Sequence, residues 1–226
     1  MLSGNIRKGL IFCGICSPLL FIITDIIAGN LYNGYSFNEQ AVSELFAIGA
    51  PTSHIVVPLF SICSILLLVF AIGIWVLCKN SHRIHILAIM VMGNAANSLI
   101  LWNLFPMHMR GVQTTFTDTM HAILAINPFI PVSILLGIII YRGWFKYYSL
   151  VTILLLLISA VISFSYISPL LSHQQTPWLG FIERVSIYAH QLWHAILAVM
   201  LIKDSGGQVA ESVIDKSRIF SKEVQK

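Results

Sequence analysis

The sequence predicts an all-α fold, an integral membrane bundle of six transmembrane helices. Of its 226 residues, 57% are hydrophobic and only 10% are charged, whereas soluble domains carry about 25% charged residues. Six apolar runs each reach the roughly 20 residues that a helix needs to cross the hydrocarbon layer. These runs are continuously apolar and do not alternate, which excludes a transmembrane β-barrel. The sorting of basic residues, described below, fits the same six spans.

The six predicted spans follow one another with short connections. They are Gly9–Ala28, His54–Cys78, Ile84–Leu104, Thr119–Tyr141, Tyr147–Leu170 and Phe181–Ile202. The first run follows Arg7 and Lys8 as a signal peptide would, but it is longer than a usual h-region and lacks a small-residue cleavage site after Asp25. We therefore interpret it as a retained helix. Residues 1–202 are predicted to form one transmembrane domain, and residues 203–226 a polar tail.

Basic residues predict the orientation of the spans. Eleven of the thirteen Lys and Arg residues fall on one side: Arg7, Lys8, Lys79, Arg83, Arg142, Lys146, Lys203, Lys216, Arg218, Lys222 and Lys226. Only Arg110 and Arg184 fall on the other side. Because cytoplasmic loops carry the excess of Lys and Arg, we expect a cell-membrane protein with both termini in the cytoplasm.

Several functional classes are disfavoured. The net charge of +4 is explained by the cytoplasmic rim and tail, so no nucleic-acid partner is predicted. Cys13, Cys16, Cys63 and Cys78 all lie in the first two spans, where packing is a better explanation than a disulfide framework. A transporter is disfavoured, because no inverted repeat is visible in the sequence. The sequence favours no particular oligomeric state.

The first outer loop, Gly29 to Ser53, contains no Lys or Arg. Ser36 and Glu39 fit a capping box, and the apolar residues that follow predict a short helix at the membrane surface. Ser43 and Glu44 would then lie near the outer mouth of the bundle. The alternative is a solvated amphipathic helix that only caps the bundle.

Three ordered blocks of sequence make the chain similar to a known family. They are Ile15–Phe21 with Tyr35-Ser36 and Ser43–Leu45, then Phe105–Gly111 with Thr117–His121, and finally Thr176–Val185 with Gln191–Trp193. In these blocks the chain resembles the DUF998 family of membrane proteins. The resemblance implies a multi-span membrane protein and assigns it no activity.

A group of ionisable residues is predicted at the outer ends of the spans. It contains Asp25, Arg110, Asp118, His121, Glu183 and Arg184. Asp25 lies about one turn below the outer end of the first span, where an acid is costly unless it is paired. Its expected partner is Arg110 or Arg184. Two interpretations stay open for the group, an ion-pair network that ties helix ends together and a ligand or catalytic site.

The last span carries a second pattern. Glu183, His190 and His194 recur at i, i+7 and i+11 and so share one helical face. The pair His190 and His194 can ligate one metal ion, and residues 190–194 resemble the last-helix motif of membrane zinc hydrolases that include alkaline ceramidases and adiponectin receptors. His121, the candidate third ligand, lies at a different depth. Asn94 and Asn97 are therefore the alternative hydrogen-bonding partners of these histidines.

Three functional hypotheses follow. The first is binding of a membrane lipid or small amphipathic ligand by Asp25, Ser43, Glu44, Arg110, Glu183 and Arg184. The second is a membrane hydrolase of lipid esters or amides. In it His121, with Asp118, would act as general base and Ser43 or Thr117 as nucleophile, or zinc bound by His190 and His194 would be the cofactor. The third is a non-catalytic packing or partner protein of the envelope.

Overall fold

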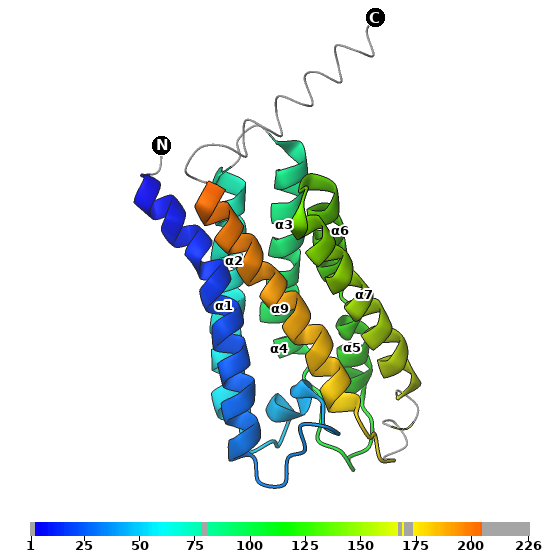
Figure 1. Cartoon of the computed structure of the whole chain (residues 1–226). Coiled ribbons are helices and arrows are strands. Elements are labelled where there is room, and N and C mark those ends of the chain that lie inside the picture. Colours follow the sequence, from blue (N-terminus) through cyan, green and yellow to red (C-terminus); the bar gives the residue numbers. More distant parts are fainter. Residues whose placement is uncertain (1–2, 78–80, 167–168, 170–173, 205–226) are drawn as a thin grey trace, which may run out of the picture.

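The chain folds into helices joined by loops, as the computed structural model in Figure 1 shows. The structure describes residues 3–77, 81–166, 169 and 174–204. Within them there is no β-strand, only an isolated bridge between Ile48 and His108. Six helical segments are long and apolar enough to cross a membrane. This confirms the predicted all-α membrane fold.

Four of the six spans are single helices and two are composite. The single helices are α1 (Gly4–Leu31), α2 (Ser53–Leu77), α7 (Trp144–Ser165) and α9 (Leu179–Asp204). The third span consists of α3 (His82–Ala96), the π-helix η2 (Asn97–Leu101) and α4 (Trp102–Leu104). The fourth consists of α5 (Phe116–Ala125) and α6 (Phe129–Ile140). A 3₁₀ helix, η1 (Val42–Phe46), lies between α1 and α2.

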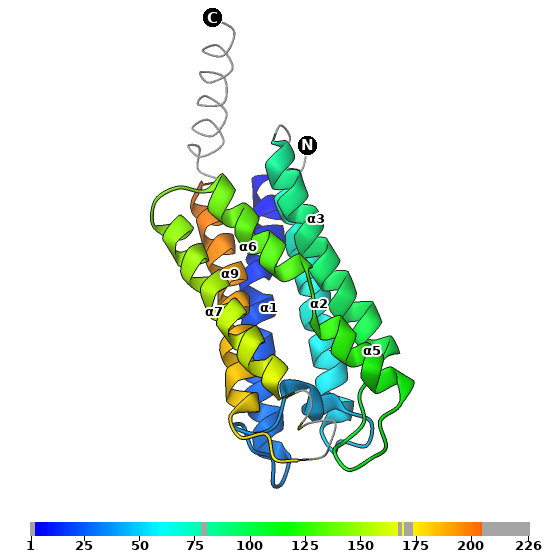
Figure 2. The same cartoon turned by 90° about the vertical axis from the view of Figure 1, so that its right-hand side faces the viewer.

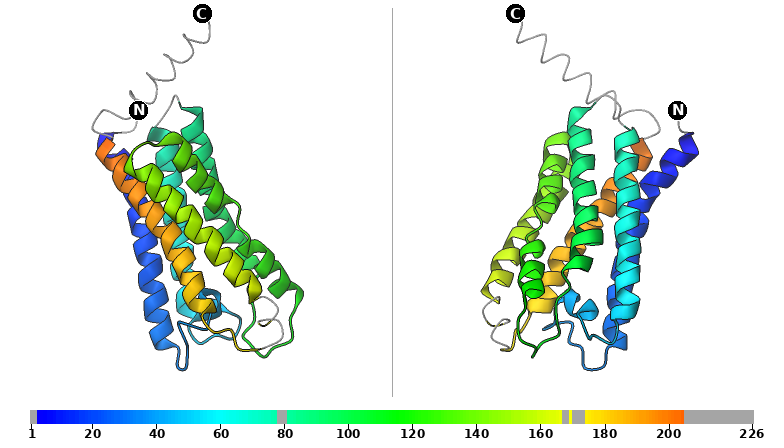
Figure 3. Two further views of the ribbon diagram at one scale, coloured as in Figure 1. Left: turned by 45° about the vertical axis from the view of Figure 1, so that its right-hand side comes forward. Right: turned by 180° about the vertical axis from the view of Figure 1, so that it is seen from behind.

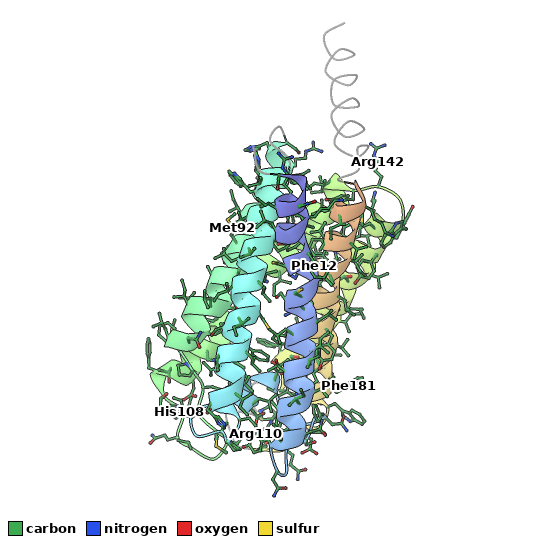
Figure 4. All side chains as sticks on the ribbon, turned by 90° about the vertical axis from the view of Figure 1, so that its left-hand side faces the viewer. Phe12, Met92, His108, Arg110, Arg142 and Phe181 are labelled. Carbon is green, nitrogen blue, oxygen red and sulfur yellow. The ribbon has the colours of Figure 1, made fainter. Side chains whose placement is uncertain are left out.

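The two ends of the bundle differ in charge. We call the end where α1 begins and α9 ends the terminal end, and the opposite end the loop-1 end, after loop 1 (residues 32–52). Figure 4 shows Arg142 at the terminal end, with His108 and Arg110 at the loop-1 end. The other described basic residues of the terminal end are Arg7, Lys8, Arg83, Lys146 and Lys203. Lys79, Lys216, Arg218, Lys222, Lys226 and most of the predicted tail lie outside the described residues, as do Cys78 and Leu170.

The spans are arranged as a ring. Each one packs against two neighbours in the order α1, α2, α3, α6, α7, α9 and back to α1 (Figure 3). Glycines allow close contacts within this ring: a Cβ added to Gly14 would lie 2.6 Å from the Phe70 ring, and one added to Gly137 would lie 2.6 Å from the Trp193 ring. Small residues commonly permit such close approach between membrane helices.

Two apolar clusters fill the two halves of the ring. The larger one, in the terminal half, is built around buried residues such as Phe70, Leu87, Phe145, Trp193 and Leu197. The smaller one, at the loop-1 end, consists of Ala28, Val42, Leu45, Phe46 and Val56. The polar residues considered below lie between these clusters or beside the smaller one.

The fourth span, predicted as one helix over Thr119–Tyr141, is interrupted at Asn127 and Pro128. Proline has no N–H to donate and disfavours the helical conformation of the preceding residue. Asn127 compensates, because its Oδ1 accepts a hydrogen bond from the Phe129 amide at 3.1 Å and its Nδ2 donates to Asn94 Oδ1 at 2.8 Å. In Figure 2, α5 diverges from α7 toward the loop-1 end.

The helix in loop 1 differs from the surface helix that the sequence predicts. Ser36 Oγ does accept from the Glu39 amide at 3.4 Å, but residues 36–40 form turns and the helix is confined to η1. All five residues of η1 are buried. The physical reason is that Leu45 and Phe46 pack into the smaller apolar cluster, which draws the segment between α1, α2 and α9.

Candidate functional site

A buried ion pair connects the first and last spans. Arg184 Nε and Nη2 donate to the two carboxylate oxygens of Asp25, each at 2.9 Å, and Tyr188 OH donates a third hydrogen bond to the same carboxylate. Asp25 is 0% exposed. The expected pairing of Asp25 is thus confirmed for Arg184. Tyr188 was not predicted from the sequence, although its position one turn after Arg184 on α9 offered a signal.

The remaining donors of Arg184 hold loop 1 against α9. Nη1 donates to the carbonyl oxygens of Phe37 and Gln40, both at 3.0 Å, and of Gly180 at 3.1 Å, while Nη2 donates to Tyr35 OH at 2.6 Å. The guanidinium also lies over the rings of Tyr35 and Phe37. An arginine has five N–H donors, and all of them have acceptors here. Arg184 therefore has no donor left for an anionic ligand.

The Tyr35 hydroxyl continues this network into loop 1. It accepts from Arg184 and donates to the carbonyl oxygen of Ala41 at 2.8 Å. Burial raises the pKa of the Tyr35 phenol above its ordinary value, although the neighbouring Arg184 opposes the shift. The phenol consequently stays neutral, and its O–H remains the donor to the Ala41 carbonyl oxygen of loop 1.

A second ion pair joins loop 1 to loop 2 (residues 105–115). Arg110 Nε and Nη2 donate to the carboxylate of Glu44 at 2.8 and 2.7 Å, and Nη2 also donates to the Glu39 carbonyl oxygen. The Ala41 amide and Gln40 Nε2 donate to the same carboxylate at 2.9 and 3.1 Å. Glu44 is almost fully buried and Arg110 is partly exposed. Both carboxylate oxygens of Glu44 are therefore occupied by the protein.

Asp118 orders loop 2 and is not hydrogen-bonded to His121. It accepts from the amide and Nδ1 of His108 at 2.6 and 3.0 Å, and from the amide and Oγ1 of Thr115 at 2.8 and 2.7 Å. His121 Nδ1 instead lies 2.9 Å from the Phe105 carbonyl oxygen, and its ring packs against Phe46 and Trp102.

The two candidate nucleophiles are not joined to His121. Thr117 Oγ1 lies 2.8 Å from Thr115 Oγ1, and Ser43 is buried within η1. Within the described residues no hydrogen bond links His121 to Asp118, Ser43 or Thr117, so the arrangement expected of a hydrolase is not assembled here.

The predicted polar face of α9 points into the ring. Phe181, Leu192 and Val199 expose 51%, 46% and 38% of their surface and mark the lipid-facing side of this helix. At about 100° per residue, Glu183, His190 and His194 lie on the opposite side. Glu183 and His190 are nevertheless only half-buried, whereas His194 is 1% exposed. Part of the surface of Glu183 and of His190 therefore remains accessible on this face of α9.

Glu183 forms no ion pair with any described residue. One carboxylate oxygen, Oε2, accepts from the Val42 amide of η1 at 2.7 Å. Asp25 and Glu44 each form an ion pair with an arginine, and Asp118 is hydrogen-bonded to His108, but no ion pair joins Glu183 to a basic side chain in the part of the chain that the structure describes. Among these acids, Glu183 is the one that forms no ion pair within the described residues.

The two histidines of α9 have no third metal ligand among the described residues. Their rings lie 6.0 Å apart and perpendicular, and His190 Nδ1 lies 3.3 Å from the Ser186 carbonyl oxygen. Over residues 3–77, 81–166 and 174–204 no group of three His, Cys, Asp or Glu side chains could hold a metal ion. Among the described residues no hydrogen bond joins these histidines to Asn94, which accepts from Asn127, or to Asn97, whose Nδ2 has no partner.

A family model described as "Protein of unknown function (DUF998)" matches residues 15–200. No curated protein and no solved structure matches the chain. The match spans the three sequence blocks that carry the resemblance, and it includes both ion-paired networks and the polar face of α9.

Proposed function

We propose a ligand-binding function for this chain, which belongs to the family described as "Protein of unknown function (DUF998)". As a multi-pass membrane protein, it binds a lipid or other small amphipathic molecule inside the ring, near the loop-1 end. The polar group of the ligand lies beside Glu183. Its apolar chain lies along the hydrophobic side chains of the ring.

The observation that supports this proposal most directly is that the Glu183 carboxyl group forms no ion pair within the described residues. A carboxylate within a membrane span is costly unless it is paired or reaches water, which makes it a functional-site candidate by default. Val42 supplies one hydrogen-bond donor, and the adjacent Arg184 is committed to Asp25 and loop 1. An amine or hydroxyl group of a ligand would supply the missing donors and, in the case of an amine, the counter-charge.

The other predicted ligand-binding residues divide into two groups in this proposal. Asp25, Glu44 and Arg184 have a structural role, because their hydrogen-bonding groups are occupied within the protein. Glu183 contacts the ligand. Arg110 is partly exposed and lies at the rim, and Ser43 is buried within η1.

The test compares three long-chain probes that share one alkyl chain and differ in the end group: a primary amine, an alcohol and a carboxylate. Binding to the purified protein in nanodiscs is followed by intrinsic tryptophan fluorescence. We expect the amine to bind best, and Glu183→Gln to weaken its binding about tenfold, the loss of about 1.4 kcal/mol. Glu39→Gln, which changes an exposed acid of loop 1, is the matched control. Unaltered amine binding in Glu183→Gln would reject the proposal.

We also propose that the loop-1 end faces away from the cytoplasm in the cell membrane. The support is the gathering of basic residues at the terminal end, as the positive-inside rule requires. In intact cells, a membrane-impermeant maleimide should label Asn33→Cys in loop 1, and it should label Lys146→Cys only after permeabilisation. The reverse pattern would invert the orientation.

A further inference from the structure

A layer of polar side chains crosses the interior of the ring between the two apolar clusters. We call Asn94, Asn97, Asn127, Gln191 and His194 the mid-membrane polar layer. Counting about 1.5 Å per residue from the terminal end of each span, these residues lie within about 14–22 Å of that end. They come from three different spans. Their common depth is therefore a property of the fold and cannot follow from the sequence of a single helix.

Only part of this layer is hydrogen-bonded internally. Asn127 Nδ2 donates to Asn94 Oδ1. By contrast, Asn97 Nδ2, Gln191 Oε1 and His194 Nδ1 are buried and have no hydrogen-bond partner within the described residues. All three side chains are more than nine-tenths buried. An unsatisfied polar group costs several kcal/mol in a membrane interior, so three at one level indicate missing partners.

The backbone at Asn97 supports the same location. Asn97 begins the π-helix η2, and the indole Nε1 of Trp102, which follows η2, is also buried without a partner. Short π segments inside α-helices are found frequently at functional sites. A ligand group would approach the layer beside His190, which is only half-buried and whose ring neighbours that of His194.

The unpaired atoms define the chemistry of the missing partner. Asn97 Nδ2 is a donor and Gln191 Oε1 is an acceptor, while His194 Nδ1 donates or accepts according to its tautomer. The partner must therefore both accept and donate hydrogen bonds. No Lys, Arg, Asp or Glu of the described spans lies at this depth, so no charge of the partner would be balanced.

We propose that the mid-membrane polar layer is a second binding site, which takes the uncharged hydroxyl or amide group of a lipid. The hydroxyl group of a long-chain alcohol or of a diacylglycerol has this chemistry. This site uses residues other than Glu183 and does not depend on the proposed function of the loop-1 end.

The test measures two properties, the unfolding temperature and the binding of a long-chain alcohol. Leucine substitutions in an unfilled ligand site should raise the first and weaken the second, whereas in an internally satisfied core they should lower the first. In ligand-free nanodiscs, Asn97→Leu and Gln191→Leu should each raise the unfolding temperature, because each removes an unsatisfied polar group. The same variants should weaken binding of a long-chain alcohol about tenfold. Asn103→Leu, which changes an exposed asparagine of α4, is the matched control and should change neither property.

Location is tested with a diazirine-bearing long-chain alcohol and with the corresponding alkane. The alcohol should cross-link to residues 97–102 and 190–194, and the alkane should not prefer them. Lower stability of the ligand-free leucine variants would show that protein or a bound water already satisfies these groups, and would overturn the proposal. Equal cross-linking by alcohol and alkane would overturn it as well. Glu183→Gln should leave alcohol binding at this layer unchanged, which separates this result from the test of the loop-1 end.

Discussion

Asp25 and Arg184 are 159 residues apart in the chain, yet two hydrogen bonds of 2.9 Å join their side chains across the α1–α9 contact. This pair closes the ring and is the most completely enclosed charge pair that the structure describes, with Asp25 fully buried. Because the same guanidinium holds two carbonyl oxygens of loop 1, those of Phe37 and Gln40, the pair also helps to fix where loop 1 lies.

Replacing one member of this pair should destabilise the protein strongly. We expect Asp25→Ala to lower the free energy of unfolding by about 3–5 kcal/mol, because it leaves the Arg184 charge buried without its partner. Unfolding in mixed detergent micelles measures the change. The double variant Asp25→Leu/Arg184→Leu should recover part of the loss. A double variant less stable than Asp25→Ala would show that the carbonyl contacts of Arg184 matter more than the ion pair.

Gly180 should not tolerate even one additional methyl group. A Cβ at this position would lie 2.2 Å from the Gln40 carbonyl oxygen and 2.7 Å from that of Phe37, both backbone atoms of loop 1. We expect Gly180→Ala to displace loop 1 and to cost about 1–3 kcal/mol or more. Amide exchange of residues 37–44 should accelerate. Gly9→Ala is the control, because a Cβ at Gly9 meets nothing within 4 Å and the change should be neutral or slightly stabilising.

Stability should fall at alkaline pH partly because of Tyr35. Its folded-state pKa is raised by burial above the ordinary value of 10.0, so above pH 10 the unfolded chain loses this proton while the folded protein keeps it. The stabilising contribution is therefore complete below pH 10 and declines as the pH rises toward the folded pKa. Unfolding measured from pH 8 to 11 should show a steeper decline for the wild type than for Tyr35→Phe. Parallel curves would assign the decline to other groups.

The asparagine pair at the break of the fourth span, Asn94 and Asn127, should contribute modestly to the free energy of unfolding. Asn127→Ala leaves the buried Oδ1 of Asn94 without its donor, and we expect a loss of about 1–2 kcal/mol. The double variant Asn94→Leu/Asn127→Leu should lose less, since it leaves no buried asparagine unpaired and only the Phe129 amide loses its acceptor. Asn103→Ala, on an exposed position of α4, should change stability by less than about 0.5 kcal/mol. Thermal unfolding in detergent distinguishes these outcomes.

The sequence predicted the six spans and the gathering of ionisable residues at one end because both depend on local composition. The length of an apolar run and the charge of its flanks are readable without tertiary contacts. Asp25 was also recognisable as a residue that needs a partner, since an isolated acid in a span is costly.

The partners of the site residues and the extent of the helix in loop 1 depend on tertiary contacts, which the sequence alone does not show. Arg110 and Glu44 were both predicted as ligand contacts, but they bond to each other across two loops, and no local pattern indicates that pairing. The helix expected after Ser36 gave way to η1 because burial of Leu45 and Phe46 outweighed the capping signal. His121 and Asp118 share the spacing of a cooperating pair, yet each is occupied by loop 2.

The attachment of loop 1 to Arg184 also orders events during synthesis. Loop 1 leaves the ribosome early, whereas the guanidinium that holds the carbonyl oxygens of Phe37 and Gln40 is translated roughly 145 residues later. Since domains assemble as their segments emerge, the early spans must be inserted while loop 1 is still without its anchor. A nascent chain stalled before residue 184 should therefore expose loop 1 to protease, and the same loop should become protected once α9 has entered the membrane.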